Sequence, residues 1–318
     1  MAEKKSKIII DTDPGIDDAQ AILYALAHPN LQVMGLTTIF GNVSADLATA
    51  NALRLLELSG HTTVPVAQGS AVPLQIAPNP VADFVHGKNG FGEVQLPAAT
   101  TVSADPRSAA QFIVDLVHAH PNEITLVPVG PLTNIAAAIA LDPSIVNLVQ
   151  AVVIMGGAVQ VKGNVTDFAE ANMWGDPHAA HAVVSAKWPQ LVVLGLDVTL
   201  QVKMTMDYFD QVAVASTKCG GFIKATAVFY AEWYLKKHGF AGCCPHDLCA
   251  LVYVSHPEFF EAKACSALSV ITEGDKIGQT VADAEGLTDS STPSSHFAVK
   301  VAEENLLADF LQTIKSLP

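Results

Sequence analysis

Short apolar runs alternate with longer amphipathic segments along most of the chain. A β-branched run at residues 8–10 is followed by a helix-like segment at residues 16–27. A near-continuous apolar run at residues 32–40 is followed by a helix-like segment that ends near residue 58, and a third run covers residues 64–67. Buried parallel strands have such apolar sequences, and crossover helices connect them. The alternation therefore predicts an α/β fold with a parallel, doubly wound sheet.

The same rhythm continues further along the chain. Strands are expected at residues 124–129, 151–155, 191–196, 267–272 and 296–301, and helices at residues 105–118, 206–216, 222–237 and 303–316. Three Asp-Pro pairs, at Asp105-Pro106, Asp142-Pro143 and Asp176-Pro177, each predict the start of a helix, because Asp is a good N-cap and Pro fits the first helical position. The sequence contains no repeat or linker, so residues 1–318 are expected to form a single domain.

The alternation stops at residues 69–97, where Pro and Gly are frequent. A long loop inside a compact domain is usually functional, so we expect this segment to form a lid or rim over a site. His86-Gly87 is one of its specific features. A second interruption, at residues 239–245, leads into His246-Asp247 at the start of a helix.

Four carboxylates follow the first strand within eight positions: Asp11, Asp13, Asp17 and Asp18. Pro14 favours an extended conformation at Asp13 and Gly15 permits a sharp turn, so the acids lie where a strand ends and a helix begins. Ligands bind at this edge in open α/β sheets. Such crowding is costly without a cation, because neighbouring carboxylates repel. Oxygen ligands without Cys or His nearby favour Ca²⁺ or Mg²⁺ over Zn²⁺.

Two other interpretations of this stretch stay open at this point. Asp17 and Asp18 can be partners of a helix dipole, with Asp11 as a turn residue, although this leaves the repulsion unexplained. A phosphatase of the haloacid dehalogenase type also places Asp-x-Asp after an apolar strand and would use Asp11 as its nucleophile. That pattern continues with Thr or Val, whereas this chain has Gly15.

A polar loop at residues 163–172 contains Asn164, Glu170 and Asn172. Their amide and carboxylate groups suit sugar hydroxyls, which both donate and accept hydrogen bonds. Composition alone also fits an ordinary surface loop.

Composition and charge narrow the classes of function. The chain has 318 residues, of which 50% are hydrophobic and 15% are charged, so it can bury a large core. A formal net charge of −14 with scattered basic residues argues against nucleic-acid binding and against docking on an anionic membrane. The start of the chain lacks the apolar core of a signal peptide, and no apolar run reaches membrane-spanning length. Five cysteines without metal-binding spacing favour a reduced, cytoplasmic protein.

Together these motifs resemble the inosine-uridine preferring nucleoside hydrolases over nearly the whole chain. The most specific motif is Asp11-Thr-Asp-Pro-Gly-Ile-Asp-Asp18. The others occur in the family's order and are Gly41-Asn42, His86-Gly87 with Gly90-Phe-Gly92, Val127-Pro-Val-Gly-Pro-Leu-Thr-Asn134, Gly163-Asn164 through Glu170-Ala-Asn172, and His246-Asp247.

The resemblance implies a fold and a role for individual residues. The implied Ca²⁺ ligands are Asp13, Asp18, the main-chain carbonyl of Val129 and Asp247, with Asp11 supporting the metal site. Asp13 also matches the base that activates the attacking water. The implied substrate-binding residues are Asp17, Asn42, His86, Asn164, Glu170 and Asn172, and His246 matches the position associated with the leaving base. The implied fold is an open, mixed, mostly parallel sheet with helices on both faces, in a homodimer or homotetramer.

The implied reaction is Ca²⁺-dependent hydrolysis of the N-glycosidic bond of ribonucleosides to ribose and a free base, in nucleoside salvage or catabolism. Bond cleavage develops positive charge on the ribose, and Ca²⁺ on the 2′- and 3′-hydroxyls orients the sugar and lowers the pKa of the attacking water. The base leaves poorly as an anion, so protonation by a His should help. A Ca²⁺-dependent nucleoside-binding protein without turnover is the remaining alternative.

Two positions on the base side depart from the family pattern. Ala171 stands where relatives often carry Phe, and the family's base-side tyrosine aligns near Tyr234. The sequence therefore leaves the preferred base open.

Overall fold

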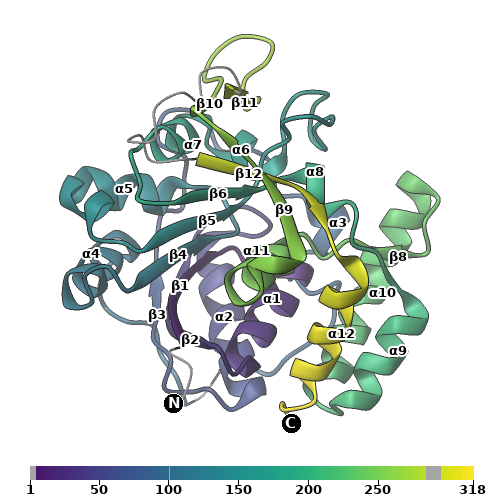
Figure 1. The fold of residues 1–318 in the computed structure, drawn as a ribbon. Helices are drawn as coiled ribbons and strands as arrows, with labels where there is room; N and C mark the ends of the chain where they lie inside the picture. Colours follow the sequence, from purple (N-terminus) through teal and green to yellow (C-terminus); the bar gives the residue numbers. More distant parts are fainter. Residues whose placement is uncertain (1–4, 100, 284–294) are drawn as a thin grey trace.

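The computed structural model describes residues 5–99, 101–283 and 295–318, and an eight-stranded sheet runs through its centre (Figure 1). The strand order is β3-β2-β1-β4-β5-β6-β12-β9. The strands are β1 (Ser6–Thr12), β2 (Leu31–Thr38), β3 (Val66–Gln68), β4 (Ile124–Pro128), β5 (Ala151–Met155), β6 (Leu191–Leu194), β9 (Phe260–Cys265) and β12 (Ser295–Val301). Neighbouring strands are parallel except for the antiparallel pair of β12 and β9. The predicted mixed, mostly parallel sheet is confirmed.

Helices cover both faces of this sheet (Figure 1). One face carries α1 (Ile16–Ala27) and α2 (Ala45–Ser59), and the other carries α4 (Ala109–Ala119), α5 (Thr133–Leu141) and α7 (Pro177–Val184). In β1, Ile8 and Ile10 join the core on the side of α1, whereas Ile9 joins the core on the side of α4. Successive side chains of a strand point to opposite faces, so one apolar run supplies both cores.

The chain after β6 completes the first face and adds smaller elements. The longer helices are α9 (Met206–Ala215), α10 (Cys219–His238), α11 (His246–Ser255) and α12 (Glu303–Ile314), and α11 packs against α1. The shorter elements are α3 (Asp83–His86), α6 (Ala171–Gly175), α8 (Leu196–Thr199), the 3₁₀ helices Pro143–Asn147 and Pro257–Phe259, and two antiparallel pairs, β7 (Met204–Thr205) with β8 (Gly242–Cys243) and β10 (Ala267–Val270) with β11 (Thr280–Asp283). The main sheet draws strands from both ends of the chain, and the single domain over residues 1–318 stays a prediction.

Two of the three Asp-Pro pairs start helices as predicted. The carboxylates of Asp142 and Asp176 accept hydrogen bonds from backbone N–H groups in the turns that follow them. The prediction for Asp105 is wrong, because α4 begins after Ser108, which is its N-cap. Asp105 instead pairs with Arg107, and the closest charged atoms are 2.8 Å apart. The N–H of Asp105 also donates to the carbonyl of Val66 in β3 (2.7 Å), so the backbone at Asp105 pairs with that strand and lies outside the helix.

Two strand predictions also change, and one strand of the main sheet is not predicted. The segment predicted at residues 191–196 stops before Gly195, which caps α8. The segment predicted at residues 267–272 forms β10, which pairs with β11 and not with the main sheet. The apolar pattern does not predict β9, because Glu261 and Lys263 interrupt it with exposed charges. Charged residues of this kind are typical of an edge strand, where they prevent pairing with other chains.

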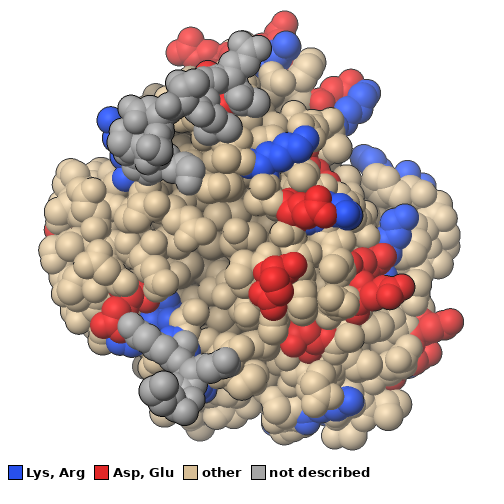
Figure 2. Space-filling model, in the orientation of Figure 1, with Lys and Arg blue, Asp and Glu red and all other residues tan. Residues whose placement is uncertain are grey.

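Charged side chains are spread over the surface. On the face shown in Figure 2, acidic and basic side chains of the described residues are interspersed. Within the described ranges, no helix is both long enough and apolar enough to cross a membrane.

Gly35 in β2 provides a test of the packing between the sheet and α4. A Cβ at this position would collide with the ring of Phe112. We expect Gly35→Ala to lower the free energy of unfolding by ~1–3 kcal/mol, because overpacking forces the ring or the strand to move. Gly221→Ala is the matched control, since a Cβ there meets no atom within 4 Å, and it should be neutral or slightly stabilising. Urea denaturation measures both, and equal stabilities would contradict this packing.

Candidate active site

The predicted site residues gather at the carboxyl ends of β1, β2 and β4. Asp13 follows β1, Asn42 lies beyond β2, and Val129 directly follows β4. Asp18 comes from the first turn of α1, and Asp247 comes from the first turn of α11. β2 and β3 extend the sheet on one side of β1, and β4 begins the other half. Ligands bind at such a switch point in open α/β sheets.

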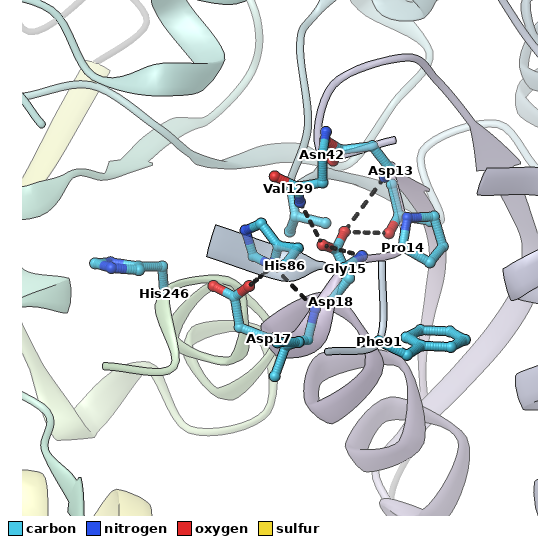
Figure 3. A network of polar contacts seen from close by, with 12 residues as sticks. Asp13, Pro14, Gly15, Asp17, Asp18, Asn42, His86, Phe91, Val129 and His246 are labelled. Atoms are coloured by element: carbon cyan, nitrogen blue, oxygen red, sulfur yellow. Dashed lines mark hydrogen bonds and ion pairs between the residues drawn. The ribbon is translucent and has the colours of Figure 1, made fainter. Parts of the chain in front are cut away.

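Asp18 fixes the turn between β1 and α1. One carboxylate oxygen accepts a hydrogen bond from Oγ1 of Thr12 (2.5 Å), and the other accepts hydrogen bonds from the N–H of Gly15 (2.9 Å) and from Nδ2 of Asn42 (2.9 Å). Gly15 is the N-cap of α1, and its N–H donates to the carboxylate of Asp18, three residues further along the helix. These donors hold a fully buried carboxylate in one orientation (Figure 3).

Asp13 has one bonded and one unpaired carboxylate oxygen, and both are buried. Oδ2 accepts a hydrogen bond from the N–H of Asn42 (2.6 Å), whereas Oδ1 has no hydrogen-bond partner among the described residues. A Cβ at Gly41 or at Gly130 would collide with this carboxylate, so glycine is required at both positions. A buried carboxylate oxygen without a partner is costly unless a cation or ligand satisfies it.

Asp17, Asp18 and Asp247 form an acidic cluster in which one oxygen of each carboxylate lies within 4.8 Å of the others. Burial, and then the charge of Asp18, raise the pKa of Asp17 to about 8. Burial also raises the pKa of Asp247 well above its usual range, and the charges of Asp17 and Asp18 add to this effect. The pKa of Asp13 is raised by burial and then by Asp18. The cluster therefore needs a nearby positive charge to keep its acids ionised.

The donor set at this edge fits a hard divalent cation. Asp13, Asp18 and Asp247 offer carboxylate oxygens, and Val129 offers a carbonyl oxygen, all of which suit Ca²⁺. The Val129 carbonyl accepts a hydrogen bond from Nδ2 of Asn172 (2.8 Å), which leaves its second lone pair for another partner. The unpaired Oδ1 of Asp13 is the clearest sign that an ion belongs here.

Asp11 lies at the end of β1, next to the proposed ligands, and is held by residues of neighbouring elements. Its Oδ1 accepts hydrogen bonds from Oγ1 of Thr37 (2.5 Å) and from Nδ2 of Asn134 (2.8 Å). Asn134 also donates to the carbonyl of Thr38 (3.0 Å) and accepts from the N–H of Ser70 (2.9 Å). Burial raises the pKa of Asp11 to about 7. The Asn134 amide thus connects β1, the end of β2 and the start of the predicted covering segment, and the location of Asp11 fits a supporting role.

The three candidates from the polar loop have different surroundings. Nδ2 of Asn172 donates to two main-chain carbonyls, including that of Val129, so its Oδ1 is available to a hydroxyl. Glu170 is buried and accepts hydrogen bonds from backbone N–H groups, two of them at the start of α6. Asn164 is exposed and accepts the N–H of a residue in α6 at 3.0 Å. The structure brings Asn172 next to the proposed ligand Val129 and leaves Asn164 at the surface.

His86 is buried in the single turn of α3, within the segment that the sequence predicts as a lid or rim. Its Nδ1 accepts the N–H of Ile16 (3.2 Å) and lies 4.0 Å from Oδ1 of Asp17 (Figure 3). Because Nδ1 is an acceptor, the neutral ring carries its proton on Nε2 and can donate from there. Burial lowers the pKa of His86 to about 3. The covering segment therefore places a neutral His beside the acidic cluster.

His246 has hydrogen-bond partners at both ring nitrogens. Oγ1 of Thr199 lies 2.7 Å from Nδ1, and the hydroxyl of Tyr234 lies 2.8 Å from Nε2. Burial lowers the pKa of His246 to about 4, so the ring is neutral at pH 7. The sequence analysis expected a histidine with an ordinary pKa near neutrality. The ring of Tyr230 lies 5.0 Å from that of Tyr234 and 5.4 Å from that of His86, centroid to centroid. His86, Tyr230, Tyr234 and His246 thus form one continuous row of contacting side chains.

Three residues that orient the site are absent from the sequence predictions: Thr12, Thr199 and Tyr230. Thr12 lies inside the acidic motif, and Thr199 lies in α8, three residues beyond the end of the strand predicted at residues 191–196. The family resemblance points to Tyr234, and Tyr230 lies four residues earlier in α10 on the same helix face. That spacing is also typical of ordinary core packing, so it does not single out Tyr230.

Comparison with known proteins identifies the class as hydrolases that act on N-glycosyl bonds. The structure matches a plant nucleoside hydrolase with a TM-score of 0.92 at 35% sequence identity, and the match covers 98% of this chain and 99% of that chain. Curated relatives include uridine nucleosidase 1 of Arabidopsis thaliana, which is 44% identical over 280 residues (88% of this chain, 82% of that protein). They also include the inosine-uridine preferring nucleoside hydrolase of Crithidia fasciculata, which is 39% identical over 278 residues (87% of each).

The family model described as inosine-uridine preferring nucleoside hydrolase matches residues 8–308. The chain belongs to this family, and the resemblance seen in the sequence motifs is confirmed.

Thr12 tests how the site orients Asp18. We expect Thr12→Val to weaken divalent-metal affinity by about 10- to 100-fold, because the partners of metal ligands fix ligand orientation. Thr37→Val is the matched control, since it removes a comparable hydroxyl from Asp11, which is not a proposed ligand. Calorimetric titration of Ca²⁺ into both variants measures the difference. Equal losses of affinity in the two variants would contradict the role given to Thr12.

Proposed function

We propose that this protein hydrolyses ribonucleosides to ribose and a free purine or pyrimidine base in a Ca²⁺-dependent reaction. Family membership supports ribonucleoside hydrolysis. The observation that carries the dependence on an ion is the buried, unpaired Oδ1 of Asp13, which lies at the switch point of the sheet in the same turn as Asp18. We therefore assign the hydrolysis reaction to the site that contains Asp13 and Asp18.

Asp13, Asp18, Asp247 and the carbonyl of Val129 would hold the ion. Bound there, Ca²⁺ supplies positive charge that orients the sugar hydroxyls and lowers the pKa of the attacking water. The acids bind a cation only when ionised, and their burial and mutual repulsion raise their pKa values. Metal binding and proton release are therefore coupled, and affinity falls as the pH is lowered.

Asp13 is the proposed base. The N–H of Asn42 holds its Oδ2, which leaves Oδ1 to accept a proton from water. Burial raises the pKa of this carboxyl, and a bound Ca²⁺ would lower it and keep the carboxylate ionised, which a base requires. Water then attacks the anomeric carbon directly as the base departs, and no covalent enzyme intermediate is required.

Asp17, Asn42, Glu170 and Asn172 are the proposed ribose-binding residues, with His86 contributing from the covering segment. The resemblance assigns the same role to Asn164, which is exposed and accepts the N–H of Ala171 at the start of α6. The Asn42 amide nitrogen donates to Asp18, so the amide oxygen can accept from a sugar hydroxyl. Asn172 presents its amide oxygen in the same way. His86 keeps an Nε2–H donor for the substrate, because its Nδ1 accepts the N–H of Ile16.

His246 is proposed to assist the leaving base together with Tyr234. The phenol lies 2.8 Å from Nε2 of the ring, and Thr199 holds the other ring nitrogen. Because the ring is neutral, the proton given to the base is the O–H proton of Tyr234 or the N–H proton of His246, and water reprotonates the donor after the base has left. This arrangement suits a poor leaving group, whose negative charge must be neutralised as the bond breaks.

The alternatives are less consistent with these contacts. A phosphatase would need Asp11 as a nucleophile, but Thr37 and Asn134 hold its Oδ1 behind the proposed ligands, and its Oδ2, although unpaired, is buried as well. A binding protein without turnover has no use for an unpaired base beside the ligand set. We also propose a cytoplasmic role in nucleoside salvage or catabolism, as a homodimer or homotetramer, which sedimentation analysis would test.

The central test is a reducing-sugar assay over a panel that contains uridine, inosine and cytidine. Exhaustive chelation should abolish ribose release, and Ca²⁺ should restore it. Asp13→Asn keeps a ligand oxygen but removes the base, so kcat should fall by about 10²–10⁴-fold with a smaller change in KM.

Full activity in verified metal-free protein would overturn the Ca²⁺ dependence. Phosphate release from phosphomonoesters would support the phosphatase, and tight nucleoside binding without ribose release would support the binding protein.

The leaving-group role predicts different effects on two substrates. His246→Ala should slow hydrolysis of a nucleoside by about 10²–10⁴-fold, the usual size of general-acid catalysis. A p-nitrophenyl riboside needs no protonation, because p-nitrophenolate is already a good leaving group, so the variant should keep most of its rate on that substrate. Tyr234→Phe should show the same contrast. Equal losses on both substrates would point to a displaced Asp247 and would remove His246 from the proton transfer.

A further inference from the structure

A second cluster of metal-ligating side chains lies at the far ends of α1 and α11. His28 is the C-cap of α1, His256 is the C-cap of α11, and Asp309 lies on α12. The first turns of the same two helices contain Asp18 and Asp247 of the candidate active site. At ~1.5 Å per residue, helices of 12 and 10 residues separate the two clusters by about 15–18 Å. The second cluster is therefore distinct from the active site.

We propose that His28, His256 and Asp309 bind a transition-metal dication such as Zn²⁺. Nε2 of His28 and Nε2 of His256 lie 3.7 Å and 3.5 Å from the same oxygen, Oδ1 of Asp309, and the three ligand atoms all lie within 4.8 Å of one another. In a tetrahedral zinc site with bonds of ~2.0–2.1 Å, neighbouring ligand atoms are about 3.4 Å apart. The separations here are long for hydrogen bonds but match ligands around one ion.

The surrounding contacts orient two of these ligands. Oδ2 of Asp309 accepts a hydrogen bond from the hydroxyl of Tyr24 (2.5 Å), which also lies 2.7 Å from Oγ of Ser255. This leaves Oδ1 of Asp309 facing the two imidazoles. Nδ1 of His256 lies 2.8 Å from Oε1 of Glu258, so its proton is held there and the Nε2 lone pair is left for a metal. A carboxylate behind a ligating histidine is the usual support of a metal site.

The third ligand, His28, is buried and meets the ring of His256 edge-on, with centroids 5.4 Å apart. Its Nδ1 accepts the N–H of Asn30 (3.2 Å). A metal on Nε2 requires the proton on Nδ1, so this hydrogen bond is lost on binding. Affinity should therefore be lower than in a closed four-ligand zinc site. The side chains of His256 and Asp309 are 24% and 19% exposed, so water can complete the coordination.

The ligand chemistry separates this site from the active site. Two imidazole nitrogens and one carboxylate suit Zn²⁺ or Co²⁺, whereas Ca²⁺ requires six to eight oxygen ligands. An ion here would join α1, α11 and α12. Since it binds only the folded chain, it should raise the temperature of unfolding.

The test is binding of Co²⁺ and Zn²⁺ to the full-length protein in saturating Ca²⁺, which occupies the carboxylate site. Wild type should bind one Co²⁺ per chain with the visible absorption of a four-coordinate nitrogen-containing site, and Zn²⁺ should displace it. His256→Gln should abolish the band, and Glu258→Gln should weaken binding by about 10- to 100-fold. His118→Gln is the matched control, because His118 pairs with Asp142 at the surface (2.6 Å) and should not affect binding.

Ribose release in Ca²⁺ should be unchanged in His256→Gln, and the metal-binding readout does not depend on the proposed activity. The site is wrong if wild type binds no Co²⁺ or if His256→Gln binds it equally well. Stabilisation of wild type that varies with pH but not with Zn²⁺ would also overturn the site, because it would assign the cluster to histidine–carboxylate pairing.

Discussion

The burial of several carboxylates at one edge of the sheet is the constraint on which the rest of the site depends. Asp13, Asp17, Asp18 and Asp247 are each no more than 4% exposed. Two unit charges 4.8 Å apart repel by about 3–4 kcal/mol at an effective dielectric constant of 20. The turn after β1 partly offsets this repulsion with hydroxyl, backbone and amide donors directed at Asp18. A dication can offset the remainder, because the unpaired oxygen of Asp13 has no donor of its own.

The packing of α1 against α11 brings the acids together and also creates the second cluster. Asp17 and Asp18 begin α1, and Asp247 begins α11, so the relative position of these helices sets the spacing of the carboxylates. The opposite ends of the helices carry His28 and His256, which face Asp309 of α12. Contacts at that end therefore restrain the same helix pair that positions the proposed Ca²⁺ ligands.

Elements that depend on local interactions are predicted accurately, whereas elements that depend on contacts between distant segments are not. The helix from Ile16 to Ala27 and the strand from Ala151 to Met155 are found with the predicted bounds, because their apolar patterns and flanking residues are local signals. The predicted start of α4 is wrong because the backbone of Asp105 pairs with β3, a contact that the local Asp-Pro signal does not reveal. β9 is not predicted because its pairing with β12 comes from a distant part of the chain and its exposed charges mask the strand pattern.

By itself, the sequence determined the α/β class, the acidic turn and the family, because apolar periodicity and a short contiguous motif are local properties of the chain. Only the tertiary structure decided that His246 is held between Thr199 and Tyr234, that His86 is buried against Ile16, and that one oxygen of Asp13 lacks a partner. These contacts join residues from separate helices and loops. Their distances depend on how the helices pack on the sheet, which no local pattern encodes.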